Sequence, residues 1–321
     1  MKHAEVVLVA SVVAGLAGYP LLISWLARHG AGQRIQEYNA LATHRVKQGT
    51  PTMGGVLFCV IIVAAWLVFD RGRAGFVAVF ALSAGALLGI LDDIANVRGQ
   101  GALGLDVRHK LALQAFIGLL IGIGLNVIGA SRQAFPGLGT PDLRGAGIII
   151  VSALAVVAVS NAVNLTDGVD GLAGSCSLVV FAGLLAVALE QHTLPVVVVS
   201  AAVVGSLIAF LIFNWFPARV FMGDTGSLAI GCALVALAAE ERLLWFLPLL
   251  GIVFVAETLS VIINVTAIRR FHRRVFRASP LHHHFEQTGL RDGRLVAWFT
   301  AVAAVGTLLT VLYARSQGSL A

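Results

Sequence analysis

Residues 147–189 read GIIIVSALAVVAVSNAVNLTDGVDGLAGSCSLVVFAGLLAVAL. The two apolar runs, Gly147–Val163 and Leu172–Leu189, each approach the length needed to cross a bilayer as a helix. Asn164, Asp167 and Asp170 lie between them. Asn, Asp and Gly are common at helix ends, so a capped turn accounts for one or two of these residues. Acids at a membrane boundary are costly to place and are usually functional, so we predict a site at this turn.

The composition of the whole chain is that of a polytopic membrane protein. Of 321 residues, 58% are hydrophobic and only 12% charged, whereas a soluble domain carries about 25% charged residues. The three cysteines lie in apolar runs without C-x-x-C spacing, which predicts packed thiols and not disulfides or zinc ligands. The net charge of +6 belongs to the loops and gives no indication of nucleic-acid binding.

Ten apolar segments of spanning or near-spanning length predict an all-α fold with about ten transmembrane helices. They are residues 5–26, 54–69, 75–91, 111–128, 147–163, 172–189, 194–213, 227–239, 243–265 and 295–313. The first lacks a small-residue cleavage pattern, so we expect a helix and not a signal peptide. The chain has no convincing internal repeat, and we expect a single transmembrane catalytic domain over residues 1–321.

The distribution of positive charge predicts the orientation of these segments. Of the 22 Lys and Arg residues, 15 lie in the odd-numbered connections. Positive residues accumulate in cytoplasmic loops, so we expect both termini outside. The cytoplasmic loops are then residues 28–53, 92–110, 164–171, 214–226 and 266–294. Every polar cluster falls in these loops, as expected of an enzyme that takes a cytosolic substrate at the inner face.

Five acids on this face predict a cation site: Asp92, Asp93, Asp167, Asp170 and Asp224. Asp92 and Asp93 follow the apolar run LLGIL, and at a helix C-terminus they would oppose the helix dipole. A bound cation or a protonation event would relieve that cost. Asp224, in FMGDTGS, has the alternative role of a helix N-cap. Hard oxygen ligands without paired His or Cys favour magnesium over zinc.

Three consecutive histidines, His282, His283 and His284, lie in the longest of the cytoplasmic loops. In an extended segment the first and third share a side and the second opposes them. An imidazole near a phosphate can donate a hydrogen bond or move a proton near pH 7. The neighbouring basic run, residues 269–277, either marks the cytoplasmic side and contacts lipid head groups or gathers an anionic substrate. Together these features suit phosphoryl chemistry between a nucleotide donor and a lipid phosphate.

Five motifs resemble those of the polyprenyl-phosphate N-acetylhexosamine-1-phosphate transferases. They are GTPTMGG at residues 49–55, LDD at 91–93, NAVNLTDGVDGLA at 161–173, FMGDTGSLA at 221–229 and PLHHHFE at 280–286. They occur in order across most of the chain. The first and the last together are similar to the branch of the bacterial phospho-N-acetylmuramoyl-pentapeptide transferases.

The resemblance implies an activity, a cofactor and a set of site residues. The implied reaction transfers phospho-MurNAc-pentapeptide from UDP-MurNAc-pentapeptide to undecaprenyl phosphate, forming lipid I and UMP with Mg²⁺. It leaves open whether transfer takes one displacement or passes through a covalent aspartyl intermediate. The implied catalytic residues are Asp92, Asp93, Asp224, His282 and His283, with the three aspartates also binding metal. The implied substrate-binding residues are Lys47, Thr52, Lys110, Asn164, Asp167, Asp170, Asn214, Phe221, Asn264 and His284.

Location and partners follow from the same resemblance. It implies a bacterial cytoplasmic membrane, contact with membrane lipids, and an active site on the cytoplasmic face; a homodimer remains open. Two departures from the family pattern are present. Asn264 stands where the family usually has Gln, so a uracil contact there is expected to be weakened or bridged by water. The chain is also shorter than most members, in its outer loops, which should leave the inner site intact.

Three other functions compete with this one. A sister enzyme that uses UDP-GlcNAc would differ in its preferred donor. A cation-coupled transporter would place acids at mid-membrane in both halves, with a path to the outside, whereas these acids cluster at one face. An inactive membrane scaffold would require all five acids to be incidental, against the cost of placing them.

Overall fold

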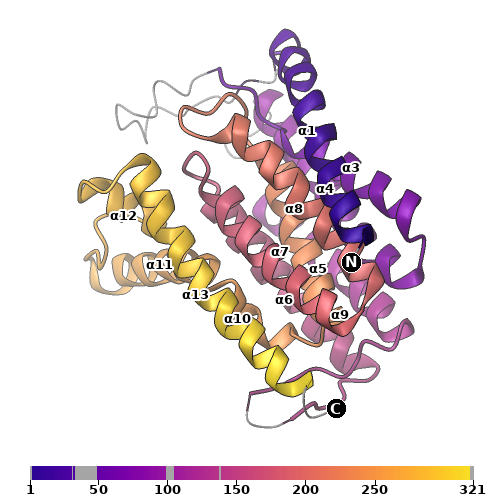
Figure 1. Cartoon of the computed structure of the whole chain (residues 1–321). Helices are drawn as coiled ribbons and strands as arrows, with labels where there is room; N and C mark the ends of the chain where they lie inside the picture. The colour runs from indigo at the N-terminus through magenta and orange to yellow at the C-terminus, as the bar shows by residue number, and fades with distance from the viewer. Residues whose placement is uncertain (1, 31, 33–48, 99–104, 137–138, 319–321) are drawn as a thin grey trace.

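Long apolar helices make up most of the computed structural model, which describes every residue except 1, 31, 33–48, 99–104, 137–138 and 319–321 (Figure 1). The long helices are α1 (Lys2–Arg28), α3 (Gly55–Phe69), α4 (Arg73–Arg98), α5 (Val107–Val127), α6 (Ala146–Thr166), α7 (Leu172–Gln191), α8 (Leu194–Asn214), α9 (Gly223–Glu240), α11 (Ile252–Phe271) and α13 (Asp292–Gly318). In the described ranges, β-pairing is limited to three isolated bridges. The predicted all-α class is confirmed.

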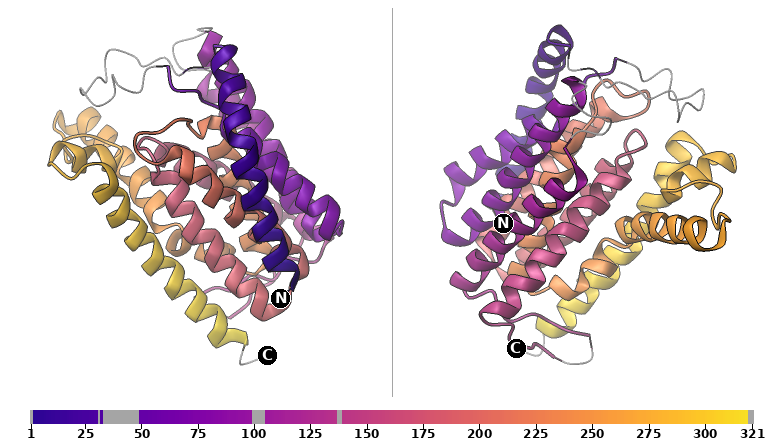
Figure 2. Two further views of the ribbon diagram at one scale, coloured as in Figure 1. Left: turned by 45° about the horizontal axis from the view of Figure 1, so that its top comes forward. Right: turned by 180° about the vertical axis from the view of Figure 1, so that it is seen from behind.

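Ten helices correspond to the ten predicted segments. In the part of the chain that the structure describes, nine helices are long and apolar enough to cross a membrane, and α3 is a tenth, shorter apolar helix. The protein is therefore an all-α polytopic membrane protein. The first described residues of α1 and the last of α13 lie at one end of the bundle, whereas the short helix α12 (Leu281–Gln287) lies at the other (Figures 1 and 2).

The predicted segment 243–265 is the one that the structure breaks. It contains a 3₁₀ turn at Leu244–Phe246, a single helical turn, α10, at Leu247–Leu250, and only then α11. Pro248 lacks a backbone N–H and Gly251 weakens the helix, so the chain changes direction between them. Helix α11 consequently points away from the direction of the main bundle (Figures 1 and 2). The apolar run contained both pieces, so hydropathy alone did not predict the break.

Helices α8 and α9 form the centre of the bundle. In each, 83% of the most apolar window is buried within the protein, against 22% for α1. Helix α9 packs against α4 through Gly89, where a Cβ atom would overlap the backbone of Asp224. Small residues allow membrane helices to approach this closely. The close approach brings the part of α4 that carries Asp92 and Asp93 to the start of α9, where Asp224 lies.

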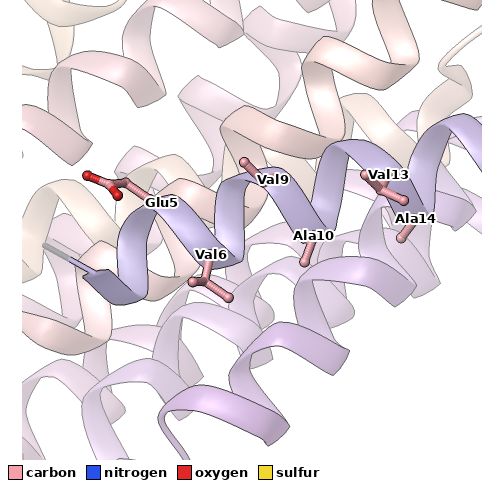
Figure 3. A pocket seen from close by; sticks show the side chains of 6 residues that line it. All are labelled: Glu5, Val6, Val9, Ala10, Val13 and Ala14. Carbon is pink, nitrogen blue, oxygen red and sulfur yellow. The ribbon is translucent and has the colours of Figure 1, made fainter.

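One face of α1 is largely apolar and exposed in the part of the chain that the structure describes. Its residues Val6, Val9 and Val13 are exposed and line a shallow pocket with Glu5, Ala10 and Ala14 (Figure 3). Lipid chains solvate such side chains, so the face needs no protein partner.

Candidate functional site

Lys110 joins two of the predicted acids. Its Nζ atom lies 2.8 Å from Oδ2 of Asp92 and 2.6 Å from Oδ2 of Asp224. Asp92 comes from α4, Lys110 from the first turns of α5, and Asp224 from the first turn of α9. Charge-assisted contacts this short are stronger than neutral hydrogen bonds, and Asp92 is 98% buried. The ammonium therefore joins α4 to the starts of α5 and α9.

The sequence had predicted that Asp92 and Asp93 lie at the end of their helix, and this prediction was wrong. Helix α4 continues to Arg98, so both acids lie inside it. The expected conflict with the helix dipole is therefore not what makes them costly. Their cost is burial, since both side chains are at least 95% buried.

Asp93 binds the start of α9. Its Oδ2 atom accepts hydrogen bonds from the backbone N–H (2.9 Å) and the hydroxyl (2.7 Å) of Thr225, and its Oδ1 atom accepts from the Asp224 N–H at 3.2 Å. A carboxylate at a helix N-terminus accepts hydrogen bonds from unpaired N–H groups and interacts favourably with the helix dipole. Asp92 and Asp93, although adjacent, thus have different partners, as their angular separation on a helix requires.

Asn164 completes the cluster from α6. Its Nδ2 atom donates to Oδ1 of Asp224 at 2.7 Å and to the hydroxyl of Ser227 at 2.9 Å. Helix α6 runs on to Thr166, so Asn164 is helical and Asp167 is the half-buried residue that caps the helix. Asn164 therefore lies in the last turn of the apolar helix α6, and the acids that follow it lie outside the helix.

The loops beside this cluster are tied by Asp170 and Asn214. Oδ2 of Asp170 accepts from the backbone N–H of Ala218 at 3.0 Å. The side chain of Asn214 accepts from the Gly171 N–H and donates to the Val220 carbonyl, each at 2.9 Å. Asp170 and Asn214 are both at least 95% buried. In this structure they join the loop after α6 to the loop after α8.

The segment from Pro51 to Gly55 pairs with the segment around Phe221. The Phe221 N–H donates to the Pro51 carbonyl and the Gly54 N–H to the Phe221 carbonyl, both at 2.8 Å. Thr52, which is largely buried, lies between this pair and Gly223. Two motifs that are separated in sequence thus form one surface beside the acids. Lys47 lies outside the described residues.

The three histidines lie in the helix α12, not in the extended segment expected from the sequence. Successive side chains therefore point in three directions, and each histidine has its own partner. His283 Nδ1 lies 2.7 Å from Glu286, one turn later. His284 Nδ1 accepts from the Arg277 N–H at 3.2 Å. His282 is 99% buried and contacts Glu257 of α11.

Glu257 was missed by the sequence analysis. It is a lone acid in the apolar helix α11 and its side chain is fully buried. The signal was present, because an isolated acid within an apolar span is itself a mark of function. Glu257 was not predicted as a site residue because its partner, His282, is distant in sequence.

Asn264 holds the chain after α11. Its Oδ1 atom accepts from the backbone N–H groups of Val275 (3.0 Å) and Phe276 (2.9 Å), and its Nδ2 atom donates to the Phe276 carbonyl at 3.1 Å. The side chain is 98% buried. In this structure the amide organises a loop, and its predicted contact with a substrate stays a prediction.

The acidic cluster has the donor set and charge for a divalent cation. The Lys110 ammonium contacts Asp92 and Asp224, and Asp93 lies beside them, so three carboxylates and one ammonium leave a formal charge of minus two. The ammonium already lies between two carboxylates, as a bound metal ion would. In the described ranges, no three acid, His or Cys side chains converge as a complete metal site. An ion held here would complete its shell with water and substrate oxygens, as Mg²⁺ commonly does.

Two family profiles match this chain. The profile of glycosyl transferase family 4 matches residues 75–240, about half of the chain, and this range contains Asp92, Lys110, Asn164 and Asp224. Signature 1 of the phospho-N-acetylmuramoyl-pentapeptide-transferases matches residues 47–59. That signature contains Thr52 and the segment that pairs with Phe221.

Curated proteins from three bacteria are similar to nearly the whole chain. The protein of Moorella thermoacetica is 42% identical over 304 residues, which cover 93% of this chain and 94% of the relative. The values for Anoxybacillus flavithermus are 39% over 298 residues, covering 91% and 92%. Those for Thermoanaerobacter sp. strain X514 are 38% over 309 residues, covering 95% and 97%. Each is named phospho-N-acetylmuramoyl-pentapeptide-transferase. This chain belongs to the phospho-N-acetylmuramoyl-pentapeptide-transferase family.

Proposed function

We propose that this protein transfers phospho-MurNAc-pentapeptide from UDP-MurNAc-pentapeptide to undecaprenyl phosphate. An oxygen of the lipid phosphate forms a bond to the sugar-linked phosphorus, the bond from that phosphorus to the UMP oxygen breaks, and UMP leaves. The products are lipid I and UMP. The observation that carries the proposal is the Lys110 bridge between Asp92 and Asp224, in a chain of this family.

We further propose that Asp224 and Asp92 hold Mg²⁺, with Asp93 beside them. The ion would neutralise negative charge on the diphosphate of the donor. The chain's own contribution is to fix the carboxylates: Asn164 donates to Asp224, and Asp93 secures the backbone on which Asp224 lies. Lys110 is then available to bind a phosphate oxygen when the carboxylates turn to the ion.

The remaining assignments rest on placement around this cluster. We propose that Asp92 acts on the lipid phosphate, and that His282 and His283 act on the donor from α12. We propose substrate contacts for Lys47, Thr52, Lys110, Asn164, Asp167, Asp170, Asn214, Phe221, Asn264 and His284. Asp170, Asn214, Asn264 and His282 are almost fully buried, so they would act on the substrates through the loops that they hold or contact.

We propose that the site faces the cytoplasm of a bacterial cell. The excess of Lys and Arg on the side of the acids supports this orientation. Both described ends of the chain lie at the opposite end of the bundle, as the proposal requires (Figures 1 and 2). The whole chain would act as one catalytic domain, in contact with membrane lipids.

A UMP-release assay on purified protein with undecaprenyl phosphate tests the proposal. UDP-MurNAc-pentapeptide and UDP-GlcNAc are compared, with and without Mg²⁺, beside Asp92→Asn, Asp93→Asn and Asp224→Asn. We expect metal-dependent release from the pentapeptide donor, reduced at least about 100-fold in the variants. Release from UDP-GlcNAc alone would assign the sister reaction. The absence of release from either donor, in folded protein, would overturn the transferase proposal.

A further inference from the structure

The carboxylate of Glu257 is fully buried and turned towards α12. Its two oxygens lie 3.2 and 3.3 Å from the backbone N–H of His282, which donates to both. The Nδ1 atom of the same histidine lies 3.2 Å from Oε1. The backbone contacts have hydrogen-bond geometry, whereas the ring contact is at ion-pair distance only. Glu257 thus contacts both the main chain and the ring of one residue.

The imidazole of His282 is fixed from two sides. Glu257 faces Nδ1, and the Nε2 atom lies against Gly168, so closely that a Cβ atom at residue 168 would overlap the ring. Gly168 lies between Asp167 and Asp170, in the loop that follows Asn164. The ring therefore connects α11 with the loop next to the acidic cluster.

The charge of Glu257 is not explained by packing. A glutamine would fill the same volume and could still accept from the His282 N–H, without the cost of burying a carboxylate. A carboxylate next to Nδ1 keeps the hydrogen on that nitrogen and leaves Nε2 as the acceptor. A neutral amide in the same place does this less effectively. The Nε2 atom that would accept a hydrogen bond faces the 167–170 loop.

We propose that Glu257 is a positioning residue, which fixes the ring orientation and the tautomer of His282 so that Nε2 faces the 167–170 loop. Glu257 has no exposed surface, so it acts through the histidine and does not touch a substrate. The inference rests on the proposed function, in which His282 acts on the donor. It adds a second component, from α11, to a site otherwise built on α4, α5, α6 and α9.

The activity test combines two variants with a matched control. Glu257→Gln should lower kcat by roughly 10- to 100-fold, the range seen when the partner that orients a functional histidine is removed. KM for the donor should change less than about threefold, because a positioning defect affects the reacting geometry. Glu257→Asp, which keeps the charge, should recover part of the loss. Glu190→Gln makes the same change at an exposed glutamate of α7 and should leave kcat unaltered.

A double-mutant cycle separates positioning from general destabilisation. Glu257→Gln should have little further effect in a His282→Gln background, because the group that it orients is gone. Additive losses in the cycle, or a Glu257→Gln variant with wild-type kcat, would overturn the proposal. An unimpaired His282→Gln variant would also overturn it.

The tautomer is measured without any activity. Nitrogen-15 shifts of labelled histidine, assigned by the loss of one signal in His282→Gln, should report a hydrogen on Nδ1 in the wild type. They should report a mixture of tautomers in Glu257→Gln. Identical shifts in the two proteins would contradict the positioning role. If the wild-type protein releases no UMP, the proposed function fails, and these shifts alone then decide whether Glu257 orients the ring.

Discussion

Gly223 lies so close to Asp93 that a Cβ atom at residue 223 would sit 2.6 Å from Oδ2 of the aspartate. The same atom would lie 2.8 Å from Oγ1 of Thr52, and the backbone at Gly223 has a φ of +72°. Residues other than glycine rarely adopt this backbone conformation. The glycine therefore allows Asp93 to bind the first turn of α9.

Gly223→Ala should both destabilise the protein and impair transfer. The left-handed backbone costs about 1–2 kcal/mol for alanine, and the added methyl group also displaces Asp93. We expect a lower unfolding temperature in detergent and a UMP-release rate reduced at least about tenfold. Gly147→Ala is the matched control, since a Cβ atom there makes only ordinary contact with Leu143. Equal behaviour of the two variants would show that the close approach at Gly223 is unimportant.

Removal of the Lys110 ammonium should abolish transfer and strengthen metal binding by the substrate-free protein. In Lys110→Met the carboxylates of Asp92 and Asp224 would face each other without their counter-charge. A divalent cation would relieve that repulsion. We expect Mg²⁺ to raise the unfolding temperature more in this variant than in the wild type.

Arg108→Met is the control for this prediction, because Arg108 is exposed and lies in the same turn of α5. It should respond to Mg²⁺ as the wild type does. A Lys110→Met variant with no added response to Mg²⁺ would argue against a cation site between the two carboxylates.

Glu241, at the end of α9 remote from the site, should make stability depend on pH. Burial raises the pKa of this carboxyl from 4.5 to about 7, although a hydrogen bond from Thr193 and the charge of Arg242 oppose the shift. The folded state therefore binds the proton more tightly than the unfolded state does. Stability from this group is present below about pH 4.5 and is lost as the pH rises to about 7.

Glu241→Gln should remove that dependence. At pH 8 the variant should be more stable than the wild type by up to about 3 kcal/mol, and at pH 5 the two should differ little. Unfolding temperatures in detergent at the two pH values provide the measurement. A stabilisation that is the same at both would assign the effect to something other than ionisation of Glu241.

Asn264→Ala should release the loop after α11. Three hydrogen bonds to Val275 and Phe276 would be lost, and Arg273, Arg274 and Arg277 lie in or beside the freed segment. We expect faster cleavage by trypsin in this region and a raised KM for the donor. Asn126→Ala removes a similar loop contact, with Gly145, at the other end of the bundle and should not produce this cleavage. Unchanged cleavage together with a raised KM would favour direct contact of Asn264 with the donor.

The sequence predicted the features that depend on composition. Apolar runs located the ten helices. Unpaired backbone N–H and C=O groups are costly in lipid, and a helix pairs them within the segment. Asp92 and Asp224 were identified because acids near a membrane core are expensive. The structure brings both to Lys110, which was predicted only as a substrate-binding residue by family resemblance.

Features that depend on long-range contacts were beyond the sequence. The pairing of Glu257 with His282 joins residues on different helices, and nothing local to either residue signals it. The helical form of the histidine segment was also missed, because seven residues are too few for periodicity to decide. The turn at Gly251 lay inside one predicted apolar segment, 243–265, where hydropathy does not distinguish one helix from two.

The bridge formed by Lys110 has a consequence for how the protein assembles in the membrane. Two helices from separate parts of the chain, α4 and α9, bring acids to one point, and the ammonium between them is covalently part of α5. The chain therefore carries its own counter-ion into the bilayer. Part of the negative charge is therefore already balanced when the bundle closes around the acids, before any soluble ligand binds.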